Sequence, residues 1–293
     1  MASMRDIKRR KESVQSTGQI TKAMKLVSSV KLQKAKVGAE VSKPYFDAMY
    51  EAVAAMIAKS GEMSHRFLQK SRSDKKAVIL ITSNRGLAGG YNSNAVKLLT
   101  KDERFTTENT VVYAVGTKGR DSVEREGYTI AGDYSEAINE PLYADASEIG
   151  KEVLSKFTMG EIGEIYLIYT IFKNTMVQIP TMMKLLPIDA SDITADAEDV
   201  EENPIDRITL MNYEPAPEEA LNAIIPKYVN SLIFGGLVES HASENGARMQ
   251  AMDSATSNAE EMISDLSLKY NRARQASITQ ELTEIIAGAS AIS

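Results

Sequence analysis

A glycine-rich segment between an apolar run and a helical pattern is the part of the sequence best suited to chemistry. It spans Arg85–Tyr91 and reads RGLAGGY. Loops that lead from a strand into a helix often bind phosphate, because the free N–H groups of the helix N-terminus face the ligand. The segment lacks the Gly-Lys-Ser/Thr of a phosphate-binding loop and the GxGxxG spacing of a dinucleotide site. A tight turn, or a surface that meets another protein, fits it better than a nucleotide site.

Residue types that serve hydrolytic or metal chemistry are scarce elsewhere. The chain has no cysteine and two histidines, His65 and His241, far apart in the sequence. The sequence therefore predicts no disulfide, no thiolate metal site and no cysteine nucleophile. Paired carboxylates such as Glu260-Glu261 lie in a helical pattern, where solubility explains them. We expect no catalytic, metal-binding or cofactor-binding residue in this chain.

The longest helical pattern covers the C-terminal part of the chain, residues 217–293. A short helix is expected over Pro217–Ile225, and Pro226 then suits the first position of the long helix that follows. Small and apolar residues recur at helical spacing from there to Ile292, which predicts a helix on the order of 90 to 100 Å long. So long a helix needs a partner helix to cover its apolar side.

A second long helical pattern covers residues 1–58. Its heptad frame is apolar at both ends, but the middle places Thr21, Ser28 and Lys31 in the seam, where a two-stranded coiled coil has leucine, isoleucine or valine. Small seam residues let helices approach closely but bury little apolar surface, at roughly 25 cal/mol per Å². We therefore expect this helix, kinked or broken at Pro44, to form a long antiparallel coiled coil with the C-terminal helix.

Between the helices, over residues 77–190, short apolar runs alternate with helical stretches. This pattern predicts parallel strands joined by crossover helices, with an edge strand at Val177–Pro187 because it contains Pro180. The predicted fold is α/β: a Rossmann-like α/β domain inserted into the coiled coil, followed by an acidic linker over 191–216. The other expected strands cover 77–82, 111–116, 128–131 and 164–170, and the expected helices 92–100, 117–126 and 142–157.

Charge is unevenly distributed. The net charge is -6, but residues 1–36 are basic and residues 192–219 are acidic, which indicates either charged partners or solvated surfaces. The basic helix lacks the interleaved aromatic residues and motifs of nucleic-acid-binding proteins. No apolar core of a signal peptide is present in the first thirty residues, and charged residues interrupt the apolar stretches of the C-terminal helix. We expect a soluble chain without a membrane-spanning segment.

Three blocks of sequence carry a family resemblance. The first runs from Ile7 (IKRR, then QITKAMKLV), the second from Thr82 (TSNRGLAGGYN), and the third from Ala247 (ARM, AMDSAT and YNRARQASITQELTEIIAGA). Together they resemble the gamma subunit of F-type ATP synthase, bacterial type. The resemblance spans nearly the whole chain in the family's order, and the third block is the most specific.

The resemblance implies a central rotor shaft. In this family the two long helices form an antiparallel coiled coil inside a ring of three alpha and three beta subunits. The α/β domain lies below, with the epsilon subunit, on the c-ring, and each complex holds one copy. Proton flow turns the c-ring and the shaft, which drives the beta subunits through their conformational states for ATP synthesis; the reverse pumps protons.

The same resemblance implies where chemistry and contacts lie. ATP, ADP and Mg belong to partner subunits, and the chain is expected peripherally at the cytoplasmic face of the bacterial cell membrane. Arg274 and Gln275 match positions that hydrogen-bond a beta-subunit loop. The expected beta-contact residues are Met24, Lys25, Arg85, Gly86, Leu87, Gly89, Gly90, Arg248, Arg274, Gln275, Thr279 and Glu281.

The second block departs from the family pattern at two positions. The family often has aspartate where this chain has Asn84 and cysteine where it has Ala88. Loss of the thiol removes no chemistry from a rotor. The change from aspartate to asparagine is expected to remove a charge contact.

Two other classes of protein stay open on the residues alone. One is a coiled-coil scaffold or adaptor that carries a flavodoxin-like domain, which would have a self-complementary apolar seam and form stable dimers; the interrupted heptads argue against it. The other is an enzyme of the α/β domain, which would need a ligand at Arg85–Tyr91.

Overall fold

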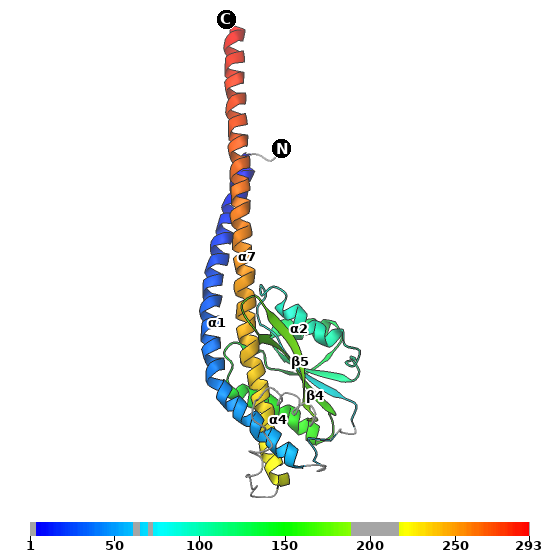
Figure 1. Cartoon of the computed structure of the whole chain (residues 1–293). Coiled ribbons are helices and arrows are strands. Elements are labelled where there is room, and N and C mark those ends of the chain that lie inside the picture. Colours follow the sequence, from blue (N-terminus) through cyan, green and yellow to red (C-terminus); the bar gives the residue numbers. More distant parts are fainter. Residues whose placement is uncertain (1–3, 61–64, 70–72, 189–216, 293) are drawn as a thin grey trace. The chain divides into compact units, whose positions relative to one another are not determined.

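Two long helices, α1 (Met4–Ser60) and α7 (Pro217–Ile292), flank a sheet domain in the sequence (Figure 1). The chain divides into two compact units: unit 1 contains residues 1–28 and 248–293, and unit 2 contains residues 29–247. Each long helix therefore contributes to both units. The computed structural model describes residues 4–60, 65–69, 73–188 and 217–292. The expected acidic linker, 191–216, and the last two residues of the expected α/β domain lie outside the described residues.

Unit 2 is built on a five-stranded sheet in the order β3-β2-β1-β4-β5. β1 to β4 run parallel, and β5 pairs antiparallel with β4 at the edge. Pro180 lies in β5, as expected, because an edge strand has one unpaired side where a missing N–H is tolerated. The strands are β1 (Lys76–Ile81), β2 (Thr110–Val115), β3 (Thr129–Asp133), β4 (Glu164–Phe172) and β5 (Gln178–Leu186).

The parallel strands separate two hydrophobic clusters. Side chains alternate between the faces of a strand, so Ala77, Ile79 and Ile81 of β1 join one cluster with α4 and α7, whereas Val78 and Leu80 join another with α2 and α3. Burial on both faces explains the continuous apolar run in the sequence. The helices are α2 (Tyr91–Thr100), α3 (Thr117–Arg125) and α4 (Tyr143–Thr158), with a short 3-10 helix, η1 (Ser135–Ile138), that the pattern did not predict.

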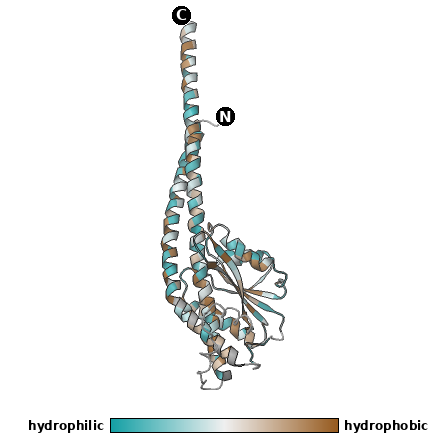
Figure 2. Ribbon diagram, viewed as in Figure 1, coloured by the Kyte–Doolittle hydropathy of each residue, from teal (hydrophilic) through white to brown (hydrophobic). Residues whose placement is uncertain are grey.

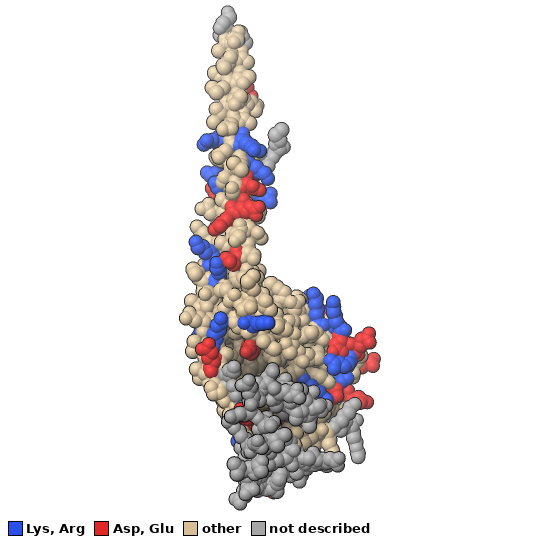
Figure 3. Space-filling model, viewed as in Figure 1, with Lys and Arg blue, Asp and Glu red and all other residues tan. Residues whose placement is uncertain are grey.

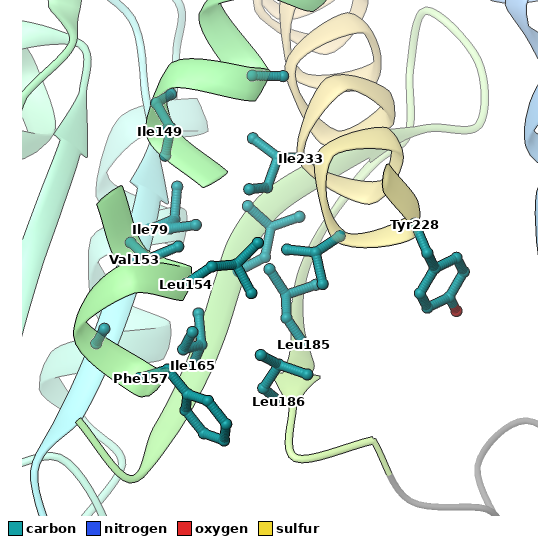
Figure 4. Close-up of a cluster of buried hydrophobic side chains, with 14 of the residues drawn as sticks. Ile79, Ile149, Val153, Leu154, Phe157, Ile165, Leu185, Leu186, Tyr228 and Ile233 are labelled. Carbon is teal, nitrogen blue, oxygen red and sulfur yellow. The ribbon is translucent and has the colours of Figure 1, made fainter. Parts of the chain in front are cut away.

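α4 and α7 cover one face of the sheet together (Figure 4). Ile149 and Val153 of α4 lie near Ile79 of β1, with Ile233 of α7 beside them (Figure 4). All four side chains are 0 % exposed, and full burial of a side chain of this size contributes about 1.5–3 kcal/mol. Val53, near the end of α1, belongs to the same cluster, so both long helices are tied to the sheet within unit 2.

α7 approaches β4 closely because its residues on that side are small. A Cβ atom on Gly236 would lie only 3.0 Å from Leu167 Cδ2. The backbone N–H of Thr170 donates to Ser240 Oγ at 3.1 Å, and Ser243 Oγ donates to the carbonyl oxygen of Thr170 at 2.9 Å. These two hydroxyls satisfy backbone groups of the strand and fix α7 along it.

In unit 1, α1 and α7 pack through small and polar residues. Thr21 Oγ1 lies 2.8 Å from Thr256 Oγ1, and a Cβ atom on Gly18 would lie 3.3 Å from Ala259 Cβ. Thr21 and Ser28 are buried, as the seam frame predicts. In the view of Figure 2, hydrophilic and hydrophobic residues are mixed along both helices.

One expectation about α1 needs correction and another is narrowed. Lys31 is exposed, and Leu32, 5 % exposed, is buried in its place; an apolar neighbour is preferred inside because burying an ammonium group is costly. The helix continues through Pro44, so of the two alternatives expected there, a kink or a break, the break is excluded.

The start of α7 also differs from the prediction. Pro226 lies inside α7, which begins at Pro217 as one continuous helix. Leu221 and Ile225, on the turn before Pro226, are 0–1 % exposed in the core cluster. Their burial holds this turn in line with the rest of the helix despite the missing N–H.

The expectation that charged residues interrupt every apolar stretch of α7 is wrong. Within Glu219–Ser290, an 18-residue window reaches a mean hydropathy of 1.2 with at most two charged residues. Half of that window is buried inside the protein. The stretch is apolar because this part of α7 packs in the core of unit 2, to which Leu221, Ile225 and Ile233 belong.

Candidate functional site

The loop between β1 and α2 presents an exposed leucine. Leu87 is 64 % exposed and has a φ of 64°, a left-handed conformation that is uncommon for a residue with a side chain. Gly89 is also left-handed, with a φ of 56°. A Cβ atom on Gly86 or Gly89 would have no atom within 4 Å. This tight turn displays an apolar side chain to the outside, as a contact surface would.

Hydrogen bonds hold both ends of the loop. The N–H of Ser83 donates to Asn92 Oδ1 at 2.9 Å, and Ser83 Oγ donates to the carbonyl oxygen of Arg85 at 2.7 Å. Ala88 is buried in a small cluster with Ala247 of α7. The loop is therefore rigidly placed, although Arg85 and Leu87 themselves are exposed.

The side-chain amide of Asn84 both donates and accepts hydrogen bonds. Asn84 Nδ2 donates to the carbonyl oxygen of Ser135 at 2.7 Å and to Asn139 Oδ1 at 3.1 Å. Asn84 Oδ1 accepts the N–H of Thr117, the first residue of α3, at 3.0 Å. A carboxylate could make only the last of these bonds. The asparagine thus does more than remove a charge, because it links the loop to η1 and to the start of α3.

The place where a doubly wound sheet binds its ligand is occupied by α7. Such ligands lie outside the carboxyl ends of the strands where the strand order reverses, here between β1 and β4. Besides the serine contacts with Thr170, Glu239 Oε2 accepts the N–H of Phe172 at 2.8 Å. Across the described parts of the chain, no group of three or more His, Asp or Glu side chains could hold a metal ion.

The predicted contact residues of α1 and the middle of α7 are partly engaged within the chain. Lys25 Nζ lies 2.6 Å from Asp253 Oδ1, with side-chain exposures of 39 % and 56 %. Met24 is half-buried, and Arg248 is 9 % exposed. A partner that contacts Lys25 would therefore meet an ion pair instead of a lone cation.

The predicted residues near the end of α7 are exposed. They are Arg274, Gln275, Thr279 and Glu281. Thr279 Oγ1 donates to the carbonyl oxygen of Gln275 at 2.9 Å, as hydroxyls in helices often do. The polar groups stand on a regular helix, which positions them better than a loop would.

An apolar face on the same part of α7 escaped the sequence analysis. Ile278, Leu282, Ile285 and Ile286 are 49–67 % exposed, and their i, i+4, i+7, i+8 spacing places them on one side of the helix. The terminal stretch carries few charged side chains (Figure 3). Contiguous exposed apolar side chains mark an interaction surface. The signal was available in the spacing, but a partner helix within the chain was expected to cover it.

Sequence comparison decides the family. The family model described as ATP synthase matches residues 3–292. A relative from Lachnoclostridium phytofermentans named ATP synthase gamma chain is 67 % identical over 292 residues, with 100 % of both chains covered. The chain belongs to the ATP synthase gamma chain family. A gamma chain from Acetobacterium woodii, named sodium ion specific, is 45 % identical with 99 % of each chain covered.

Solved structures agree with this fold. A chain of the Euglena gracilis mitochondrial ATP synthase in rotational state 3 matches with a TM-score of 0.68 at 19 % identity, covering 99 % of this chain and 94 % of that one. The rotor of the same enzyme in rotational state 1 gives a TM-score of 0.65 at 18 % identity, covering 94 % and 98 %. The predicted α/β fold with two long helices is confirmed. A gamma chain is a non-catalytic subunit of the ATP synthase complex.

Proposed function

We propose that this chain is the central rotor shaft of an F-type ATP synthase. It couples rotation of a c-ring to the conformational cycle of catalytic beta subunits during ATP synthesis, and it transmits rotation in reverse when ATP hydrolysis pumps ions. The observation that carries the proposal is full-length identity of 67 % with a gamma chain. The relatives and solved structures support this reading, and none supports the scaffold alternative.

The surface of unit 1 fits a shaft that turns inside a sleeve. Basic and acidic side chains are mixed over the paired helices, and the end of α7 is mostly uncharged (Figure 3). A shaft must not bind one orientation too tightly, because a ligand shifts a conformational equilibrium only by its differential affinity for the states. Scattered charge and the small apolar face at Ile278–Ile286 provide contact with the ring, but they do not favour one rotation angle strongly over the others.

The partners in this proposal are the alpha and beta subunits in a 3:3 ring, the epsilon subunit and the c-ring, with one copy of this chain per complex. ATP, ADP and Mg bind to the partner subunits. The chain lies at the cytoplasmic face of the bacterial cell membrane and meets the membrane only through the c-ring. The matched solved structures, which are of a central stalk with its c-ring, an F1 and c-ring assembly, and a rotor, support this arrangement.

Protons are the coupling ion in this proposal. The ion binds to the c-ring, so its identity is independent of the residues of this chain. The sodium-specific name of one relative makes the direct measurement worthwhile: ion pumping by the reconstituted complex, with and without Na⁺.

Reconstitution tests the rotor role. The full chain is mixed with alpha and beta subunits from the same source, the complex is isolated, and a bead is attached through a cysteine introduced at Lys118, an exposed residue of α3. We expect one copy per three alpha-beta pairs and stepwise rotation that depends on ATP. The chain has no native cysteine, so modifying the introduced cysteine before the subunits are mixed labels this chain at one position. A stable homodimer that does not associate with alpha and beta would overturn the proposal.

A further inference from the structure

Unit 2 contains a half-open cavity that is lined by none of the predicted beta-contact residues. Its volume is about 270 Å³, and it lies between α1, α7 and the β4–β5 edge of the sheet. Phe46, Met49 and Tyr50 line it from α1, and Tyr169 lines it from β4. The size is just below that of sites for drug-sized ligands, roughly 300–1,000 Å³. It suits a molecule of one small ring and a short chain.

The cavity exists because α7 has a glycine where a side chain would fit. A Cβ atom on Gly235 would meet only the Phe46 ring, with its nearest atoms at 3.9 Å, which is ordinary contact. Glycine inside a helix is less stable than alanine, because its backbone loses more conformational freedom on folding. Gly236 beside it is different, because its Cβ would meet Leu167 at 3.0 Å. Packing thus explains Gly236 but leaves Gly235 without a structural reason.

Two polar groups in the cavity wall are positioned for a cationic ligand. Glu239 lines the cavity, and one of its carboxylate oxygens accepts the N–H of Phe172 at 2.8 Å. That bond fixes the carboxylate and leaves its second oxygen available. Tyr169 also lines the cavity, and burial together with the charge of Glu239 raises the pKa of its phenol, so the hydroxyl stays protonated. Among the described residues of the wall there is no lysine or arginine to neutralise Glu239.

We propose that this cavity binds a small organic cation, an aromatic or alkyl ammonium with an apolar body. The ammonium group meets the free carboxylate oxygen of Glu239, and the apolar body packs among Phe46, Met49 and Tyr50. Aromatic faces attract cations, so the aromatic wall and the carboxylate favour the same ligand. This site is independent of the proposed rotor function.

Methionine methyl groups report directly on this cavity. Met49 and Met183 line it, whereas Met159 and Met176 are 72 % and 75 % exposed elsewhere. The full chain is labelled with [methyl-¹³C]methionine and titrated with 2-phenylethylammonium. The neutral analogue 2-phenylethanol, which has the same shape, is titrated in parallel. Substitutions Met49→Leu and Met183→Leu assign the two signals.

Three variants separate charge, space and folding. Glu239→Gln removes the charge but keeps an oxygen that can accept the Phe172 N–H. Gly235→Leu fills the cavity, and Gly235→Ala is its control because a Cβ atom has room there. Helical circular dichroism and a thermal melt establish that each variant folds.

We expect 2-phenylethylammonium to shift the Met49 and Met183 signals and to leave those of Met159 and Met176 unchanged. It should bind at least fivefold more tightly than 2-phenylethanol. Binding should weaken at least tenfold in Glu239→Gln, vanish in Gly235→Leu and persist in Gly235→Ala. Absence of shifts at 10 mM ammonium ligand, equal binding of the alcohol, or unchanged binding in folded Glu239→Gln would each overturn the proposal.

Discussion

Lys25 Nζ and Asp253 Oδ1 lie 2.6 Å apart and join α1 to α7 within unit 1. The Thr21–Thr256 hydroxyl contact lies about one helical turn away on each helix. The Thr21 contact occurs in the seam, where a coiled coil usually has apolar side chains, whereas Lys25 lies beside the seam, where coiled coils usually form interhelical salt bridges. An exposed ion pair contributes little to stability, about 0.2–1 kcal/mol. We therefore infer that the main effect of the Lys25–Asp253 pair is to select the register in which the two helices pack.

Reversing the charges at this pair tests the register. Lys25→Asp alone and Asp253→Lys alone each place like charges together, so each should lower the unfolding free energy by about 0.5–1 kcal/mol and lower ion pumping per ATP hydrolysed. The double reversal should recover both. Thermal unfolding and pumping by the reconstituted complex form a double-mutant cycle. Additive losses in the double variant would show that the two side chains act separately.

The exposed end of α7 should transmit rotation without stabilising the chain. Changing Arg274 and Gln275 together to alanine should lower ATP-driven pumping severalfold with no measurable change in unfolding temperature, because both side chains are exposed. Lys269→Ala, exposed on the same helix, is the matched control and should pump normally. Normal pumping in the double variant would contradict the predicted beta-subunit contact.

Asn84→Asp should destabilise unit 2 at neutral pH. A carboxylate would face the oxygens of Ser135 and Asn139 without a proton to donate, a loss of about 1–3 kcal/mol. The negative charge of the carboxylate near the N-terminus of α3 is favourable and would offset about 0.3–1 kcal/mol of this loss. The net loss is about 1 kcal/mol.

This loss should depend on pH. The two facing oxygens raise the folded-state pKa of the introduced carboxyl group above its unfolded value, so stability is retained below the unfolded pKa and lost as pH rises through the folded pKa. Urea unfolding of the wild type and of Asn84→Asp between pH 4 and 8 measures this pH dependence. A constant difference across this range would show that the amide donor is not used.

The Tyr134 hydroxyl donates to Glu152, which also pairs with Lys156 Nζ at 3.1 Å. Burial alone would raise the pKa of Glu152, but the hydrogen bonds from Tyr134 and Lys156 outweigh it and hold the pKa below its ordinary value. A depressed carboxyl pKa stabilises the fold above the unfolded pKa, and this contribution is lost as pH falls through the folded pKa. Tyr134→Phe should cost about 1 kcal/mol at pH 7 and move acid unfolding to higher pH.

Tyr128→Phe is the control for this pH dependence. The Tyr128 hydroxyl donates to the carbonyl oxygen of Phe105 at 3.0 Å, which does not titrate. Tyr128→Phe should lower the free energy of unfolding by about 1 kcal/mol, as Tyr134→Phe does at pH 7. The decrease should be equal at pH 4 and pH 7. Identical pH profiles for the two variants would exclude Glu152 as the cause.

Periodicity made much of the fold predictable. The runs at Ala77 and Val111 have the period and bounds of buried parallel strands, and Pro180 has the chemistry of an edge strand, so these followed from local rules. Thr21 and Ser28 likewise indicated a seam of small residues. The contact residues of α7 came from the resemblance of the third sequence block, because no local rule singles out Arg274 among exposed arginines.

Contacts between distant residues decided the rest. α7 runs through Pro226 because burial of Leu221 and Ile225 outweighs one lost hydrogen bond, a comparison that no local pattern contains. The use of Asn84 as a donor depends on Ser135, which only the folded chain brings near. Sequence by itself determined which segments are helix or strand, because those depend on neighbours in the chain. Tertiary structure decided where α7 covers the sheet, where the cavity at Gly235 lies and which charges pair, because these depend on atoms that meet only after folding.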